Sequence, residues 1–217
     1  MNILLQYLIL FLNIYVVTVF ISGCGFLLKK YIFNYEDKYS FENNNLWGFI
    51  LISFIALLLN FFVPLNLFNN SFVFLILFLI IFWKKYFDQP IRSFLKKSII
   101  VTILAFILII YSNVNNPDAF LYHLPFSKIL NEYKILIGSF NIHHRFGHIS
   151  IIQYTNSFFN LIFLNEKGLL LPLGILVSNF LIYLLKEFRL LFKSNINRSN
   201  SIIVFFILIV SIYSFSR

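Results

Sequence analysis

The sequence predicts an all-α fold, that of a polytopic helical membrane protein, and two observations carry this prediction. Hydrophobic residues make up 60% of the 217-residue chain and charged residues 12%, with a mean hydropathy of +0.86, whereas soluble domains contain about 25% charged residues. Apolar runs of bilayer-spanning length also recur, with cations at their edges. The composition excludes a disordered chain. The net charge of +9 is carried by loops between the runs, so the expected partner is the lipid bilayer and not a nucleic acid.

Seven apolar runs predict about seven transmembrane helices in a single domain, residues 1–217. The first run is too long for the core of a signal peptide, and the third needs flanking residues or snorkelling lysines to complete a span. Residues 113–148, between the fourth and fifth runs, are expected to form an external loop with juxtamembrane helices. The runs are 3–28, 46–65, 71–83, 98–112, 149–164, 169–185 and 201–214.

The distribution of lysine and arginine predicts the orientation. Loop 29–45 contains three of these cations, turn 64–70 none and loop 84–97 five. The first and third loops are therefore expected in the cytoplasm of a bacterium, with the N-terminus and the 113–148 loop on the periplasmic side of the inner membrane. Loop 186–200 disagrees, because its four cations would lie outside if all seven runs crossed. Either the cations of the early loops determine the orientation, or one late apolar segment does not cross the membrane.

The segment after the fourth run contains a carboxylate and two helix-starting prolines. Pro117 suits the first position of a helix, and Asp118 then lies in the first turn, where the helix dipole favours a carboxylate. Pro125 begins a second helix whose apolar residues recur at i, i+3, i+4 and i+7, a pattern typical of an amphipathic helix in the membrane interface. These apolar residues are Phe126, Ile129, Leu130 and Tyr133.

Polar side chains continue from this loop into the fifth run. Because intramembrane polar groups are costly unless they face protein or water, the polar face of the fifth run is expected to face inward, toward a site. The loop residues are His143, His144, Arg145 and His148, and the residues on one face of the fifth run are Gln153, Asn156, Ser157 and Asn160.

These residues resemble the first catalytic loop of the polytopic GT-C glycosyltransferases. More closely, the pattern is similar to a family of uncharacterised bacterial membrane proteins of that superfamily, with a D-x-x-x-Y-H loop and an R-x-G segment. The matching residues are Asp118, Tyr122, His123, Arg145 and Gly147, and the resemblance covers roughly residues 40–185. Many members have nine or more spans, so the chain is expected to be a short member or the N-terminal part of a longer one.

The resemblance implies transfer of a sugar from a polyprenyl-phosphate carrier to a cell-envelope acceptor. It implies Asp118 as the catalytic base, with His123 as a second catalytic residue. A guanidinium pairs bidentately with phosphate, so Arg145 suits the leaving phosphate. The residues expected to bind substrate are Tyr122, His143, His144, Arg145, His148, Gln153 and Asn156.

Other interpretations remain for the same residues. Asp118 could only cap a helix, His123 could be an interfacial side chain bonded to backbone, and Arg145 could snorkel to head groups. The polar face of the fifth run could join helices. The whole chain could then be a non-catalytic scaffold or a lipid-handling or transport protein. Ionisable groups gathered in one loop, and not within spans, favour interface chemistry over a transporter.

No metal or other cofactor is predicted. Cys24 is the only cysteine, which excludes a disulfide framework and a cysteine metal site. His144 and His148 are four residues apart, which leaves a divalent metal as an alternative. Gly147 lies between them, however, and the Glu of an H-E-x-x-H motif is missing.

Overall fold

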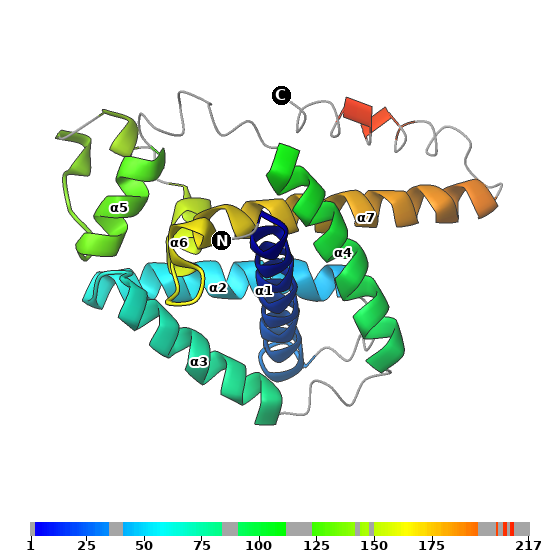
Figure 1. The fold of residues 1–217 in the computed structure, drawn as a ribbon, viewed down its shortest axis with the longest axis horizontal. Coiled ribbons are helices and arrows are strands. Elements are labelled where there is room, and N and C mark those ends of the chain that lie inside the picture. Colours follow the sequence, from blue (N-terminus) through cyan, green and yellow to red (C-terminus); the bar gives the residue numbers. More distant parts are fainter. Residues whose placement is uncertain are drawn as a thin grey trace.

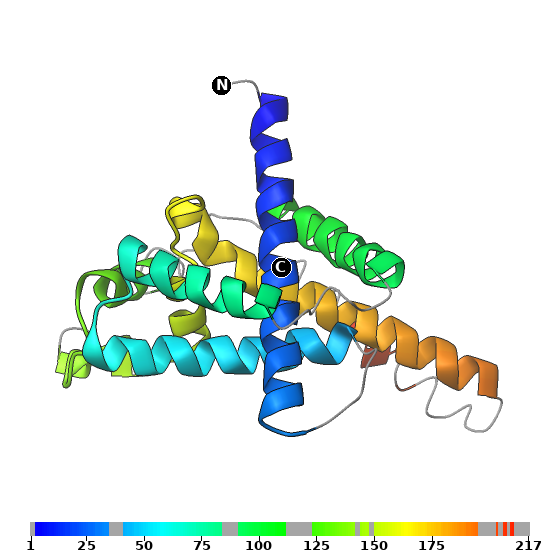
Figure 2. The ribbon, with the colours of Figure 1, turned by 90° about the horizontal axis from the view of Figure 1, so that it is seen from below.

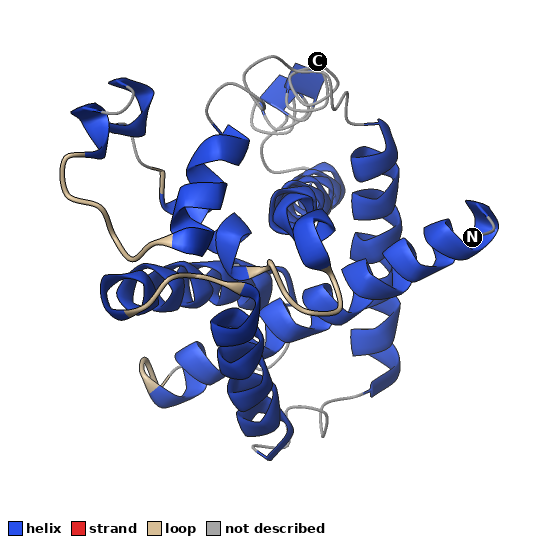
Figure 3. Ribbon diagram, turned by 60° about the vertical axis from the view of Figure 1, so that its left-hand side comes forward, coloured by secondary structure: helices blue, strands red, loops and turns tan. Residues whose placement is uncertain are grey.

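The computed structural model confirms an all-α fold. It describes residues 3–34, 41–83, 91–111, 123–141, 144–147 and 150–194, and five residues of the final segment (203, 206, 207, 209 and 210). Every regular element in these residues is a helix (Figure 3).

Within the described residues, four helices are long and apolar enough to cross a membrane. A fifth apolar helix, α3 (Leu67–Trp83), has 17 residues and a length of about 26 Å, a little less than a hydrocarbon core of about 30 Å. The chain is therefore a membrane-embedded helical protein. The four longer helices are α1 (Ile3–Tyr31), α2 (Phe41–Phe62), α4 (Ile91–Tyr111) and α7 (Leu171–Ser194).

The predicted count of seven spans is not confirmed, because the run 149–164 does not form one long helix. The helix α6 (Ile151–Phe158) has eight residues and a length of about 12 Å. A 3-10 helix, η5 (Asn165–Leu170), then leads into α7. The helix stops because the side chain of Asn70 donates to the carbonyls of Ser157 and Asn160, at 2.9 and 3.2 Å. The run 201–214 lies almost entirely outside the described residues.

The helix α5 (Leu124–Glu132) confirms the amphipathic helix predicted after Pro125. Phe126 and Leu130 are buried, but Tyr133 lies beyond the helix end and is exposed. The apolar face packs on protein: the ring of Phe126 lies 5.5 Å from that of Phe146, and Leu65 N–H donates to the Leu130 carbonyl at 2.8 Å. The apolar face of α5 therefore contacts protein, and the position of this helix in the membrane interface stays a prediction.

The helices α1 and α2 cross in close contact. A Cβ at Gly25 would overlap the carbonyl of Asn44, and one at Gly48 would overlap the carbonyl of Ile21. Glycine thus allows the two backbones to touch. The N-terminal half of α1 projects beyond the other helices (Figure 2), and its side chains from Ile3 to Leu12 are largely exposed.

The helices bring distant segments together at two ends of the bundle. The helices α2 and α7 run in opposite directions, and the start of α2 lies beside the middle of α7, beyond which the end of α7 extends (Figure 1). The start of α4 joins them, and we call this the cationic end. The end of α2 and the start of α3 contact α5 and α6, and we call this the loop end.

Candidate functional site

The structure describes four of the predicted site residues with their side chains: His123, His144, Gln153 and Asn156. Arg145 lies in the 3-10 helix η4 (His144–Gly147), which follows η3 (Ser139–Asn141), and only its backbone is described. Asp118, Tyr122, His143 and His148 lie outside the described residues.

His123 and Gln153 meet at the loop end, from the starts of α5 and α6. The two side chains are joined by a hydrogen bond of 3.0 Å between Gln153 Nε2 and His123 Nδ1. Gln153 also belongs to a capping box, in which its Oε1 accepts from the backbone N–H of Ser150 at 3.3 Å and Ser150 Oγ accepts from Ile152 N–H. Because Oε1 is used by Ser150, the amide NH₂ faces the imidazole. His123 Nδ1 then accepts, and its Nε2 carries the ring proton.

Two buried asparagines attach α5 and α6 to the spanning helices. Asn60, near the end of α2, donates from Nδ2 to the carbonyls of Leu130 and Tyr133, at 3.4 and 3.1 Å. Asn70, in α3, donates to the carbonyls of Leu65 and Ser157, at 2.7 and 2.9 Å. These bonds offset the cost of burying the amide groups.

The same region contains buried acceptor oxygens that lack donors. Nine buried side-chain oxygens of the described residues have no hydrogen-bond partner there, and six of the nine lie at the loop end. An unsatisfied buried acceptor costs about 1–3 kcal/mol, so these oxygens lower the stability of the loop end. We call the six residues the acceptor cluster: Asn60, Asn70, Asn131, Asn156, Ser157 and Asn160.

The acceptor cluster partly confirms the sequence prediction. Ser157 and Asn160 are buried, and Asn156 is half-buried with a buried Oδ1, so the polar face of the fifth run faces protein. Sequence reasoning missed Asn60 and Asn70, although an amide within or beside an apolar run was a usable signal.

The described residues contain no group of three His, Cys, Asp or Glu side chains that could hold a metal ion. Amide and hydroxyl oxygens are hard ligands, so the acceptor cluster suits a cation of the alkali or alkaline-earth kind better than zinc. His144 is exposed in η4. The proposed pairing of His144 with His148 lies partly outside the described residues.

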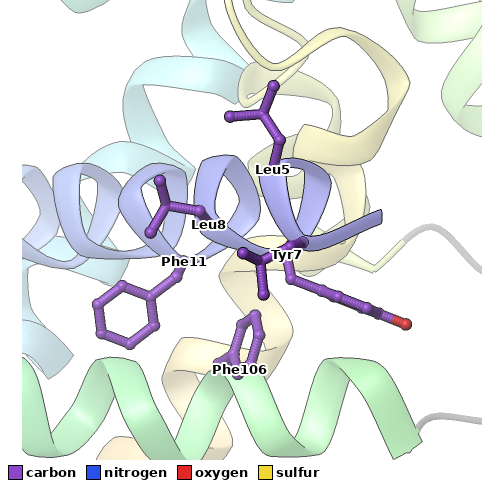
Figure 4. A pocket seen from close by; sticks show the side chains of 6 residues that line it. Leu5, Tyr7, Leu8, Phe11 and Phe106 are labelled. Atoms are coloured by element: carbon purple, nitrogen blue, oxygen red, sulfur yellow. The ribbon is translucent and has the colours of Figure 1, made fainter. Parts of the chain in front are cut away.

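A separate apolar groove runs between the N-terminal half of α1 and α4 (Figure 4). It has a volume of about 580 Å³. Phe106 reaches from α4 toward α1, with its ring 6.3 Å from that of Tyr7 and 5.7 Å from that of Phe11, both edge-to-face. The remaining lining residues are Leu4, Leu5 and Leu8. A groove of this composition fits a hydrocarbon chain.

The fold and the site together define a helical membrane protein with a polar, acceptor-rich site at one end of its bundle. The chain belongs to the family described as Domain of unknown function (DUF8201), whose model matches residues 7–217. No curated protein and no solved structure shows a significant match to the chain.

Proposed function

We propose that this protein is a GT-C-like membrane glycosyltransferase, or the N-terminal part of one. It transfers a sugar from a polyprenyl-phosphate carrier to a cell-envelope acceptor. The observation that supports this proposal is the His123–Gln153 pair at the loop end. Its imidazole and amide groups are at least partly exposed, and such groups form hydrogen bonds with sugar hydroxyls.

In this proposal Asp118 acts as the base. It takes the proton of the acceptor hydroxyl while the acceptor oxygen bonds to the anomeric carbon of the sugar. The bond from that carbon to the phosphate oxygen breaks, and polyprenyl phosphate leaves with the electron pair. General-base help contributes about 10²–10⁴-fold. The Nε2–H of His123 and the guanidinium of Arg145 stabilise the charge on the leaving phosphate.

The proposed location is the bacterial cell membrane, with the loop end on the periplasmic side. The non-spanning α6 supports this orientation, because α7 then ends on the same side as the starts of α2 and α4. Loops 29–45 and 84–97 and segment 186–200 contain twelve of the seventeen lysines and arginines. In the proposed orientation all three belong to the cytoplasmic side, as the positive-inside rule requires.

Cysteine labelling tests the orientation in a Cys24→Ser background. Ile137 is fully exposed at the loop end, and Ile137→Cys should react with a membrane-impermeant reagent added to intact cells. Ser194→Cys, at the end of α7, should react only after the cells are permeabilised. The reverse pattern would invert the proposed orientation.

A lipid-handling protein is the second candidate, and the apolar groove between α1 and α4 favours it. Both candidates need the groove to hold a hydrocarbon chain. Only the glycosyltransferase would break the bond between the sugar and the carrier phosphate, so an assay of sugar transfer distinguishes the two candidates.

The experiment measures sugar transfer from polyprenyl-phosphate donors by the chain reconstituted in liposomes. Asp118→Asn should lower turnover by about 10²-fold or more, because Asn keeps the shape and capping ability but is no base. Glu132→Gln is the matched control, since Glu132 is exposed and forms a surface ion pair with Lys128 one turn away, at 3.9 Å. Wild-type turnover by Asp118→Asn would remove the catalytic assignment. Movement of intact lipid without any transfer would favour the second candidate.

A further inference from the structure

Glu42 joins three helices at the cationic end. Its side chain is buried, with Oε2 at 4.0 Å from Lys97 Nζ on α4 and 3.8 Å from Lys186 Nζ on α7. Asn179 Nδ2 donates to the Glu42 carbonyl at 2.9 Å, and Asn45 Nδ2 donates to Asn179 Oδ1 at 3.0 Å. The start of α2, the beginning of α4 and the middle of α7 are thus held together.

This arrangement holds two ammonium groups close together. Because both approach one oxygen, the two Nζ atoms are no more than 7.8 Å apart, the sum of the two distances. The lysine side chains are 39% and 45% exposed, whereas that of Glu42 is 6% exposed. One carboxylate offsets one of the two positive charges, so the group of three has a net charge of +1. A second anion on the exposed side would offset the remainder.

The surrounding charges also favour an anion. Lys96 and Arg189 are exposed beside this group, on the same two helices, and Lys29 and Lys30 end α1. Glu187, on α7, is half-buried and is the other acid among the described residues of the cationic end. Basic groups between membrane helices on the cytoplasmic side are suited to anionic head groups.

The position of the lysines favours a lipid over a free anion. Lys97 and Lys186 lie within the candidate spans Phe94–Tyr111 and Gly168–Leu190, about one turn from the end of each. Exposed apolar side chains flank them: Leu95 and Ile99 on α4 and Leu185 on α7. Acyl chains can therefore lie along α4 and α7 while a phosphate meets the two ammonium groups.

We propose that Lys97 and Lys186, positioned by Glu42, bind the phosphate of an anionic phospholipid at the cationic end. The phosphate accepts charge-assisted hydrogen bonds from both ammonium groups. This site is independent of the proposed transferase activity, which involves the opposite end of the bundle.

The test follows the midpoint of thermal unfolding, Tm, of the full chain in detergent. Phosphatidylglycerol and phosphatidylcholine with the same acyl chains are titrated separately, and a ligand that binds the folded state raises Tm with its concentration. Phosphatidylglycerol should raise Tm more than phosphatidylcholine. Lys97→Gln with Lys186→Gln should weaken the apparent affinity for phosphatidylglycerol about 25-fold, at about fivefold for each lysine. Lys128→Gln with Lys134→Gln, at the loop end, is the matched control and should keep the wild-type affinity.

Three results would overturn the proposal: an unchanged affinity in the Lys97/Lys186 double variant, an equal response to the two lipids, or a response to inorganic phosphate as large as that to phosphatidylglycerol. The last would identify a free-phosphate site. If the double variant does not fold, Lys186→Gln alone leaves the Lys97–Glu42 pair and should weaken affinity about fivefold. In the wild-type chain, about 0.5 M salt should remove the preference for phosphatidylglycerol, and a preference that survives this salt would also refute the site.

Discussion

Replacing Asn70 by leucine should destabilise the loop end, because Asn70 determines where α6 stops. Its side chain is fully buried and donates to the carbonyls of Leu65 and Ser157, with the Asn160 carbonyl also within 3.2 Å. Leucine has a similar volume and no donor, so the change removes the hydrogen bonds without leaving a large cavity.

The magnitude follows from counting unsatisfied groups. An amide has two hydrogens to donate, so leucine removes two hydrogen bonds. The Leu65 carbonyl loses its donor, at about 1–3 kcal/mol, whereas the Ser157 carbonyl keeps the Asn160 N–H at 3.1 Å and loses only a second bond, at about 0.5–1.5 kcal/mol. It also removes the Oδ1 of Asn70, which has no donor among the described residues, and this relieves about 1–3 kcal/mol. We expect a net loss of about 0.5–1.5 kcal/mol in the free energy of unfolding.

The assay is reversible unfolding in mixed micelles, together with hydrogen exchange of the backbone at 159–164. Exchange there should become faster in Asn70→Leu, because the turn after α6 loses its anchor. Asn69→Leu is the matched control: Asn69 is half-buried, and its side chain donates to the nearby Pro64 carbonyl at 2.9 Å. Equal stability of Asn70→Leu and wild type, with unchanged exchange at 159–164, would refute the role of Asn70.

Three further predictions follow from the contacts. In Gln153→Leu, His123 Nδ1 loses its hydrogen-bond donor, so the ring proton should be distributed between Nδ1 and Nε2 instead of being held on Nε2. Ring ¹⁵N chemical shifts measure this distribution, and unchanged shifts would contradict the hydrogen bond. Gly48→Ala should lower stability by about 1–3 kcal/mol, and by more than Gly23→Ala. The methyl group at position 48 meets backbone, whereas the one at position 23 meets the side chain of Ile81, which can shift without moving a helix. Equal effects on Tm would contradict the close helix contact. Alkaline carbonate should leave the chain in the membrane pellet, and release into the supernatant would contradict a membrane-embedded protein.

Hydropathy and length predicted most of the fold, because a bilayer requires long helices whose backbone groups are bonded internally. The runs around α1, α2, α4 and α7 were identified in this way, and α3 begins at Leu67, in the flanking residues that the short third run was expected to need. The end of α6 could not be predicted. It depends on Asn70, which is 87 residues away in sequence from Ser157.

The candidate site was also predicted only in part, because local patterns are visible in the sequence whereas contacts between distant residues are not. Helical spacing identified the polar face that contains Gln153 and Asn156, since spacing is a local property. The partner of Gln153, His123, lies 30 residues earlier, and both residues were named without any sign that they touch. Asn60 and Asn70 were overlooked because the sequence gives no measure of how deeply an amide beside an apolar run is buried. The role of Asp118 remains a prediction.

The short α6 also affects the energetics of membrane insertion. Moving one positive charge outward against a membrane potential of 100 mV costs about 2.3 kcal/mol. Segment 186–200 carries four lysines and arginines, so an additional crossing through α6, which would place this segment outside, would add about 9 kcal/mol of electrical work for their export. In the proposed orientation, with α6 held at the loop end, the inside-negative potential instead draws the end of α7 toward the cytoplasm. The potential that would oppose a crossing at α6 thus favours the proposed orientation.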